Sequence, residues 1–359
     1  METKKRYLGI DLLKGIAMIL IILLHSIQRI DGIPAIVRLP LLFGQVGVQL
    51  FFVCSGFLLA KTYFKKDTVI SFSSHGKYMM KKYISLALPF IFFLVVYIII
   101  NLVFEKNGIE VPYENNTSLV SVLLNALMLH GLFPFCLNNV VPGGWYVGTL
   151  FLLLLVSPLF RFRNKKTYEF LAVAITVTAV VVSVLLDTIG VSVDNGSYFY
   201  FSFFNQLPAF IIGIKMGAFE SETRKTSFFA FAKVAFCFAL VMALFFFGFS
   251  FSYAIIPFLS AVAFEGVYEF MCAIPEEKIE KFGGFFIKLG KNTYPIYLAH
   301  FLAVWYVPVF IMGVSGNKIG GVLLWIVSLL VSFVLCLAAS GINGMFSKMI
   351  KSTVKKLKL

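Results

Sequence analysis

The sequence from Leu8 to Gln28 reads LGIDLLKGIAMILIILLHSIQ. An α-helix rises about 1.5 Å per residue, so about twenty such residues are enough to cross the hydrocarbon core of a bilayer. The run is longer than the apolar core of a signal peptide, and it lacks a small-residue cleavage pattern. We therefore expect it to remain in the protein as the first membrane helix.

Apolar stretches of spanning length recur to the end of the chain. They lie near residues 43–63, 84–104, 145–160, 168–187, 198–218, 228–249, 252–271, 293–313 and 320–346. Only 13% of the 359 residues are charged, about half the share found in soluble domains, which excludes a water-soluble fold. The sequence predicts an all-α, polytopic membrane bundle of about ten transmembrane helices, forming one integral membrane domain over residues 1–359. Residues 118–133 are too short to span, so we expect an interfacial or re-entrant helix there.

Basic residues gather in alternate connections between these segments. They lie at residues 4–6, 61–82, 161–166, 215–225, 278–291 and 348–358. Cytoplasmic loops carry an excess of Lys and Arg, so the alternation predicts that both termini are cytoplasmic. Arg29 and Arg38, in the first outer loop, are an exception. The net charge of +14 therefore reflects orientation in a membrane, and we expect no nucleic-acid partner.

Ionisable residues inside hydrocarbon are costly, so their positions select candidates for function. The expected spans contain Asp11, Lys14, His25, Glu265 and His300. On one helix Lys14 and His25 would differ by about 20° in direction and by roughly 16 Å along the axis, and Asp11 would share their face. A histidine can take a proton from a hydroxyl at neutral pH, and a cation at the cytoplasmic end suits a phosphate-bearing donor.

A structural interpretation of these residues is also open, and spacing alone favours it. Lys14 can be an ordinary positive flank that pairs with Asp11 three residues earlier, and His25 an interfacial residue at the end of its helix. His300 can be packed and hydrogen-bonded to a neighbouring helix, with Tyr297 one turn before it. Glu265 is expected to find an ion-pair partner.

Three other features receive structural interpretations. Ser55 precedes Gly56 in an apolar run, where such a pair more often permits close helix packing than nucleophilic attack. The densest basic cluster is most simply the positive-inside signal; its lysines are at positions 65, 66, 77, 81 and 82. Four of the five cysteines fall inside apolar segments, so we infer no disulfide framework and no metal site.

Four stretches that span nearly the whole chain carry a resemblance. The first runs from Arg6 through Lys14 to His25, with ten residues between the last two. The others are Gly47-Val-Gln-Leu-Phe-Phe-Val-Cys-Ser-Gly-Phe-Leu-Leu59, then Gly144-Trp-Tyr146 leading to Ser157-Pro-Leu159, and Leu289-Gly-Lys-Asn-Thr-Tyr-Pro-Ile-Tyr-Leu-Ala-His300. Together they resemble the membrane acyltransferase family 3, which includes O-acetyltransferases of bacterial surface glycans and related succinyl transferases.

The resemblance implies ten helices, an acyl-CoA donor that enters from the cytoplasm, and His25 as the essential catalytic residue. Acyl-CoA would be a substrate, and no bound cofactor is expected. Donor binding falls to Lys14, with Arg6 as a helper, although the family usually carries arginine at the Lys14 position, whose planar fork suits phosphate better. The residues expected to position the acceptor or to support the site are Asp11, Trp145, Tyr297 and His300.

We expect an O-acyltransferase, most simply an O-acetyltransferase, in a bacterial inner or cytoplasmic membrane. Its acceptor would be a hydroxyl of a cell-envelope glycan or of a lipid-linked glycan precursor, and its partners enzymes of envelope-glycan biosynthesis. The alternative is a transporter or flippase of a glycan or lipid, since buried ionisable groups also suit a translocation path. Against it, the two halves of the sequence show no repeat symmetry of the kind many transporters carry.

Overall fold

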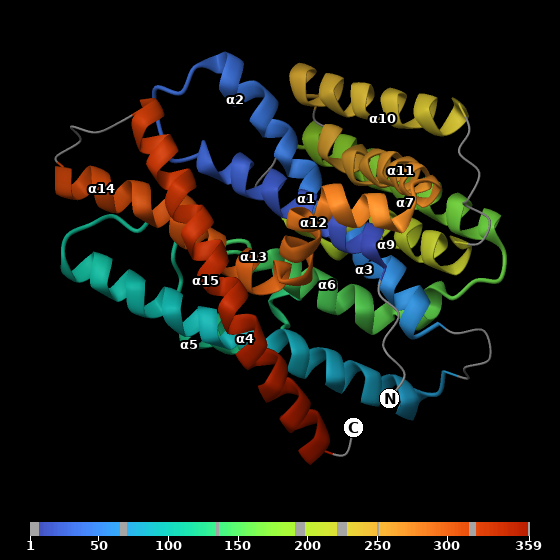
Figure 1. Cartoon of the computed structure of the whole chain (residues 1–359), viewed down its shortest axis with the longest axis horizontal. Coiled ribbons are helices and arrows are strands. Elements are labelled where there is room, and N and C mark those ends of the chain that lie inside the picture. The colour runs from blue at the N-terminus through green and yellow to red at the C-terminus, as the bar shows by residue number, and fades with distance from the viewer. Residues whose placement is uncertain are drawn as a thin grey trace. The chain divides into compact units, whose positions relative to one another are not determined.

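Helices make up the regular structure of the chain. The computed structural model describes residues 7–64, 70–133, 136–190, 198–220, 228–249, 251–315 and 321–357 (Figure 1). Within these ranges the chain is helical and holds no strand. The prediction of an all-α fold is confirmed.

Eight helical stretches of the described residues are long and apolar enough to cross a membrane. They belong to α1 (Leu8–Ser26), α2 to α3 (Ala35–Thr62), α4 (Phe72–Lys106), α7 (Lys165–Thr188), α10 (Phe228–Phe247), α11 (Ser252–Ala273), α13 to α14 (Thr293–Ser315) and α15 (Gly321–Lys356). The other two expected segments form shorter helices, α6 (Trp145–Val156), followed by the 3-10 turn η4 (Ser157–Phe160), and α9 (Phe203–Ala218). A polytopic helical bundle is therefore confirmed.

Short helices occupy several of the connections. Residues 118–133 form α5 (Leu119–Ala126) and the 3-10 turn η2 (His130–Leu132), both too short to span. The sequence treated residues 278–291 as a basic connection, but they lie in a 16-residue helix, α12 (Glu276–Lys291). Its buried residues Gly283, Ile287 and Gly290 recur at helical spacing while its lysines are exposed, so the segment is an amphipathic helix where charge alone suggested a loop. The spanning stretch Ala35–Thr62 consists of α2 (Ala35–Leu42), the 3-10 turn η1 (Phe43–Gln45) and α3 (Val46–Thr62), and α8 (Tyr198–Phe201) is a further short helix.

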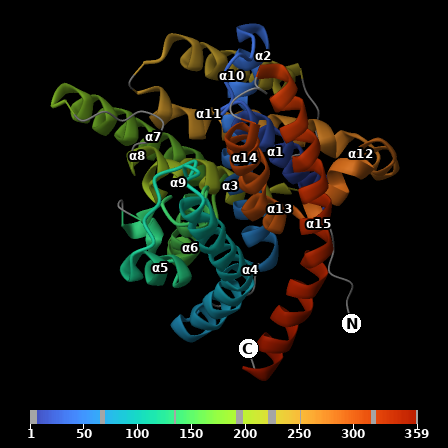
Figure 2. The ribbon, with the colours of Figure 1, turned by 90° about the vertical axis from the view of Figure 1, so that its left-hand side faces the viewer.

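The chain forms two compact units, each assembled from segments that are far apart in the sequence. The first comprises Met1–Met18, Gln45–Val69 and Ser157–Lys291; the second comprises Ile19–Gly44, Ile70–Val156 and Asn292–Leu359. α10 lies beside α11 in the first unit, and α13 lies beside α15 in the second (Figures 1 and 2). The first part of α1, with Asp11 and Lys14, belongs to the first unit, and its end, with His25, belongs to the second.

Glycines bring α3 and α9 together in the first unit. A Cβ added to Gly56 would collide with the carbonyl oxygen of Phe210, and one added to Gly213 would collide with that of Val53. The two backbones therefore approach as closely as small residues allow. This confirms close helix packing at Gly56.

Tyrosine hydroxyls form hydrogen bonds between the helices of the second unit. Tyr97 on α4 donates to the carbonyl of Leu298 (2.9 Å), and Tyr294 on α13 donates to that of Leu86 (2.8 Å). Tyr306 donates to Asn101 Oδ1 (2.5 Å), which is also buried. The bonds of Tyr97 and Tyr306 satisfy buried polar groups and that of Tyr294 a partly buried one, so α13 is held in a defined position against α4.

Candidate active site

His25 lies in the last turn of α1 and is half-buried. Its Nδ1 is 2.7 Å from Oε1 of Gln28, which follows the end of the helix. An amide oxygen only accepts hydrogen bonds, so this contact assigns the proton of the neutral ring to Nδ1. The lone pair of Nε2 then remains available as a base or a nucleophile.

His300 is the second histidine of the site and comes from the last turn of α13. Its side chain is 1% exposed, and Nδ1 donates to the carbonyl oxygen of Tyr297 at 2.5 Å. Nε2 is buried and has no hydrogen-bond partner among the described residues. Leaving a buried polar group unpaired costs about 1–3 kcal/mol, so the acceptor Nε2 is suited to receive a hydrogen bond from a bound substrate.

Aromatic rings surround His25 in the second unit. The ring centre of His25 lies 4.4 Å from that of Phe301, 5.4 Å from that of His300 and 5.9 Å from that of Trp305. The structure thus brings together His25 and His300, which are far apart in the sequence. Aromatic rings beside an imidazole shield it in part from bulk water, which favours proton transfer from a bound hydroxyl over hydrolysis.

Tyr297 connects this cluster to the turn that precedes α6. Its hydroxyl donates to the carbonyl oxygen of Gly143 (2.7 Å), and its ring centre lies 5.2 Å from that of Tyr146. Gly143 has φ +74°, and its N–H donates to Asn138 Oδ1 (2.6 Å). Trp145 is buried at the start of α6, and that helix reaches the cluster through Tyr146.

Lys14 and Asp11 form an ion pair in the first unit. The distance from Lys14 Nζ to Asp11 Oδ1 is 3.3 Å, and both side chains are partly exposed. The sequence-based expectation that these two residues pair is confirmed. Arg6, the expected helper in donor binding, lies outside the described residues.

The two arginines that broke the charge rule have local partners in the second unit. Arg38 donates from Nη2 to the carbonyl of Ile27 (3.1 Å), and the Arg29 guanidinium lies 5.0 Å from the centre of the Trp305 ring. A cation over an indole face is attracted by the ring quadrupole. These contacts give the arginines a structural role in the loop after α1.

Four residues of the site were missed by the sequence analysis: Gln28, Arg29, Phe301 and Trp305. A usable signal existed for the first two, because positions three and four after His25 continue its helical face. Phe301 and Trp305 gave no signal, since aromatic residues are common throughout this chain.

His130 is a further buried histidine, in the second unit and outside the candidate spans. It stacks on Phe90 with ring centres 5.4 Å apart, and its Nε2 donates to the carbonyl of Gly144 (2.9 Å). Burial lowers the pKa of His130 to about 4, although hydrogen bonds to backbone carbonyls act in the opposite direction. The side chain is therefore neutral at pH 7.

Stability should fall as the pH drops from about 6.5, the pKa expected of His130 in the unfolded chain, toward about 4, its pKa in the fold. Over this window the unfolded state binds more protons than the folded state, and the loss is on the order of 3 kcal/mol. His130→Gln should flatten this dependence. Melting temperatures of the purified protein at pH 7.5 and pH 5 measure the effect, and equal slopes in both proteins would contradict the assignment.

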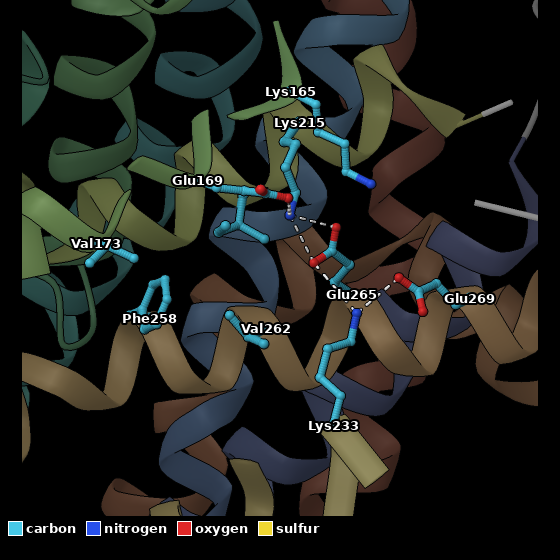
Figure 3. A pocket seen from close by; sticks show the side chains of 10 residues that line it. Lys165, Glu169, Val173, Lys215, Lys233, Phe258, Val262, Glu265 and Glu269 are labelled. Carbon is cyan, nitrogen blue, oxygen red and sulfur yellow. Dashed lines mark hydrogen bonds and ion pairs between the residues drawn. The ribbon is translucent and has the colours of Figure 1, made fainter. Parts of the chain in front are cut away.

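The first unit holds a charged cavity of about 290 Å³ (Figure 3). Lys215 on α9 lies between Glu169 (3.2 Å) and Glu265 (2.8 Å), and Lys233 on α10 lies between Glu265 (3.6 Å) and Glu269 (2.9 Å). The expectation that Glu265 finds an ion-pair partner is confirmed. The sequence analysis counted Lys215 at the start of a basic connection, but it lies inside α9 and is 4% exposed. Carboxylates from two other helices hold its charge inside the unit.

Comparison with known proteins gives one match. A family model described as an acyltransferase domain matches residues 7–341. The matched range includes the cluster around His25, the Lys14–Asp11 pair and the charged cavity. No curated protein and no solved structure matches the chain.

Proposed function

This chain belongs to the membrane acyltransferase family 3, and from that premise we propose that it is an O-acyltransferase, most simply an O-acetyltransferase. The donor is a cytoplasmic acyl-CoA. The acceptor is a hydroxyl of a cell-envelope glycan or of a lipid-linked glycan precursor in a bacterial cytoplasmic membrane. Enzymes of envelope-glycan biosynthesis are the expected partners.

The observation that carries the proposal is the state of His25. Its Nδ1 is engaged by Gln28, which leaves the lone pair of Nε2 for chemistry, and its ring lies beside the rings of His300 and Phe301. Acyl transfer to a hydroxyl needs a base near neutral pH, in a place where water competes poorly with the acceptor.

His25 can act in either of two ways. As a general base, Nε2 takes the proton of the acceptor hydroxyl while its oxygen attacks the thioester carbonyl. As an acyl carrier, Nε2 attacks the thioester first and passes the acyl group to the hydroxyl afterwards. In both routes Gln28 holds the ring in the reactive tautomer, and His300 and Tyr297 orient the ring or the acceptor.

Lys14 is the proposed contact for the phosphates of the donor. Replacing it by methionine should raise the KM for acyl-CoA by roughly 10- to 150-fold, because a charge-assisted hydrogen bond is worth roughly 1.5–3 kcal/mol, while kcat should change little. Lys14→Arg should keep or lower the KM. Steady-state kinetics with varied acyl-CoA measure both values.

Asp11→Asn is the matched control for Lys14, since it removes the carboxylate that lies 3.3 Å from Nζ and keeps the lysine. Its KM for acyl-CoA should be equal to or below that of the wild type. An unchanged KM in Lys14→Met would remove Lys14 from donor binding.

The test of the proposed function is label transfer in membranes that contain the wild-type chain. Radiolabelled acetyl-CoA and succinyl-CoA are supplied separately, and label is followed into envelope glycans and lipid-linked precursors. Transfer above that of membranes lacking the chain supports the proposal and identifies the acyl group. Absence of transfer from every CoA thioester would contradict it and would direct attention to transport of the glycan or lipid.

A further inference from the structure

Trp305 occupies an irregular turn between α13 and α14. Residues Leu302–Tyr306 form a π-helix, between α13 (Thr293–Phe301) and α14 (Val307–Ser315). A π-turn is hydrogen-bonded between residues five apart, and such turns occur frequently at functional sites. The turn brings residues five apart toward the same side of the helix, so Trp305 shares a side with His300.

The indole N–H of Trp305 is buried and has no hydrogen-bond partner among the described residues. A second tryptophan of the same unit provides a contrast, because Trp325 donates from Nε1 to Ser26 Oγ at 2.9 Å. The four tyrosine hydroxyls around α13 also have partners. Trp305 Nε1 and His300 Nε2 are both buried and unpaired among the described residues. The rings that carry these two atoms each lie within 6 Å of the His25 ring, measured between ring centres.

The charge near Trp305 has the sign that an anion requires. The Arg29 guanidinium lies 5.0 Å from the centre of the indole ring. A cation over the ring strengthens the N–H as a donor and stabilises negative charge that forms beside it.

We propose that Trp305 donates its Nε1–H to the carbonyl oxygen of the thioester and stabilises the oxyanion of acyl transfer. The inference rests on the proposed function. The acceptor oxygen forms a C–O bond to the carbonyl carbon, the hydroxyl proton goes to His25 Nε2, and the carbonyl π electrons move to the oxygen that Trp305 binds. The electrons then return, the C–S bond breaks, and the thiolate leaves with its electron pair and takes the proton from His25. The products are an ester and free CoA thiol.

The test measures initial rates of acyl transfer by the purified full chain. The variants are Trp305→Phe, and the chain with benzothienylalanine at position 305, an isostere in which sulfur replaces the N–H. We expect kcat to fall about 100-fold, the effect typical of one oxyanion donor, with the KM for acyl-CoA within about threefold of the wild type. If Trp305→Phe does not insert, the isostere decides the outcome. A kcat within about twofold of the wild type in the isostere variant would overturn the proposal.

Two further measurements separate this role from packing. Trp325→Phe also removes an indole N–H, but one that has a partner, and it should keep kcat within about twofold. Hydrolysis of acyl-CoA without acceptor passes through the same oxyanion, so it should fall in the Trp305 variants by the same factor as transfer. Reduced transfer with unchanged hydrolysis would show that Trp305 only positions the acceptor. If the wild type transfers acyl groups and the Trp305 variants transfer them equally well, only the role of Trp305 is overturned. If the wild type itself transfers none, both the proposed function and the role of Trp305 are overturned.

Discussion

Replacing His25 by alanine should lower kcat/KM for acyl transfer by about 1,000-fold or more. Removal of a positioned base typically costs 10²–10⁴-fold, and His25 is the histidine whose ring lies beside the rings of His300 and Trp305. The protein should still insert, because the half-buried ring lies at the end of α1 rather than in its packed middle. Label transfer per unit of inserted protein is the measurement.

The matched control is His75→Ala. His75 belongs to the same unit but lies on α4, where its Nε2 contacts the carbonyl of Leu155 (2.9 Å). This variant should keep wild-type transfer. His25→Ala with wild-type transfer would remove His25 from the mechanism.

The same pair of proteins separates the two routes of transfer. Wild type incubated with labelled acyl-CoA and no acceptor, then quenched, should carry protein-bound label if His25 is an acyl carrier. The label should be absent from His25→Ala. Wild type that transfers acyl groups without ever carrying label assigns His25 as a general base.

Replacing Lys215 by methionine should destabilise the protein by about 3–5 kcal/mol. Lys215 is almost fully buried and pairs with both Glu169 and Glu265, so its loss leaves Glu265 with the single, longer contact to Lys233 at 3.6 Å. The protein in detergent should melt at a lower temperature, and the yield of inserted protein should fall.

Two variants control this experiment. Lys165→Met removes a lysine that lines the same cavity but is exposed, and it should change stability by less than about 0.5 kcal/mol. The double variant Lys215→Met with Glu265→Leu should recover much of the loss, because no buried charge is left unpaired. A melting temperature of Lys215→Met equal to that of the wild type would contradict the role of the network.

Sequence patterns predicted the helices well because length and apolar content are local properties. They predicted Lys215 poorly, since its burial depends on glutamates that come from α7 and α11 and are distant in the sequence. Apolar content also ended the expected segments at charged residues, which hid the amphipathic helix α12. The fold class could be predicted, but the packing of charges could not.

The residues of the candidate site also differ in how well the sequence could predict them. His25 and His300 could be selected because a polar ring is conspicuous in an apolar run. Trp305 could not be selected, because on a regular α-helix it would point about 140° away from His300. No sequence pattern predicts the π-turn that changes this direction. Gln28 lies just beyond the end of α1, where helical spacing is a weaker guide.

The tyrosines of the second unit have a consequence for how the enzyme protects itself. An activated ester can modify any free hydroxyl that it meets, including those of the protein that handles it. Tyr97, Tyr294, Tyr297 and Tyr306 all lie on or against α13 and its π-turn, and each commits its O–H to a carbonyl or amide oxygen of the chain. A hydroxyl held in this way is fixed to its partner and cannot move toward a thioester without breaking that bond, so we expect the bonds that hold the helices together also to limit self-acylation.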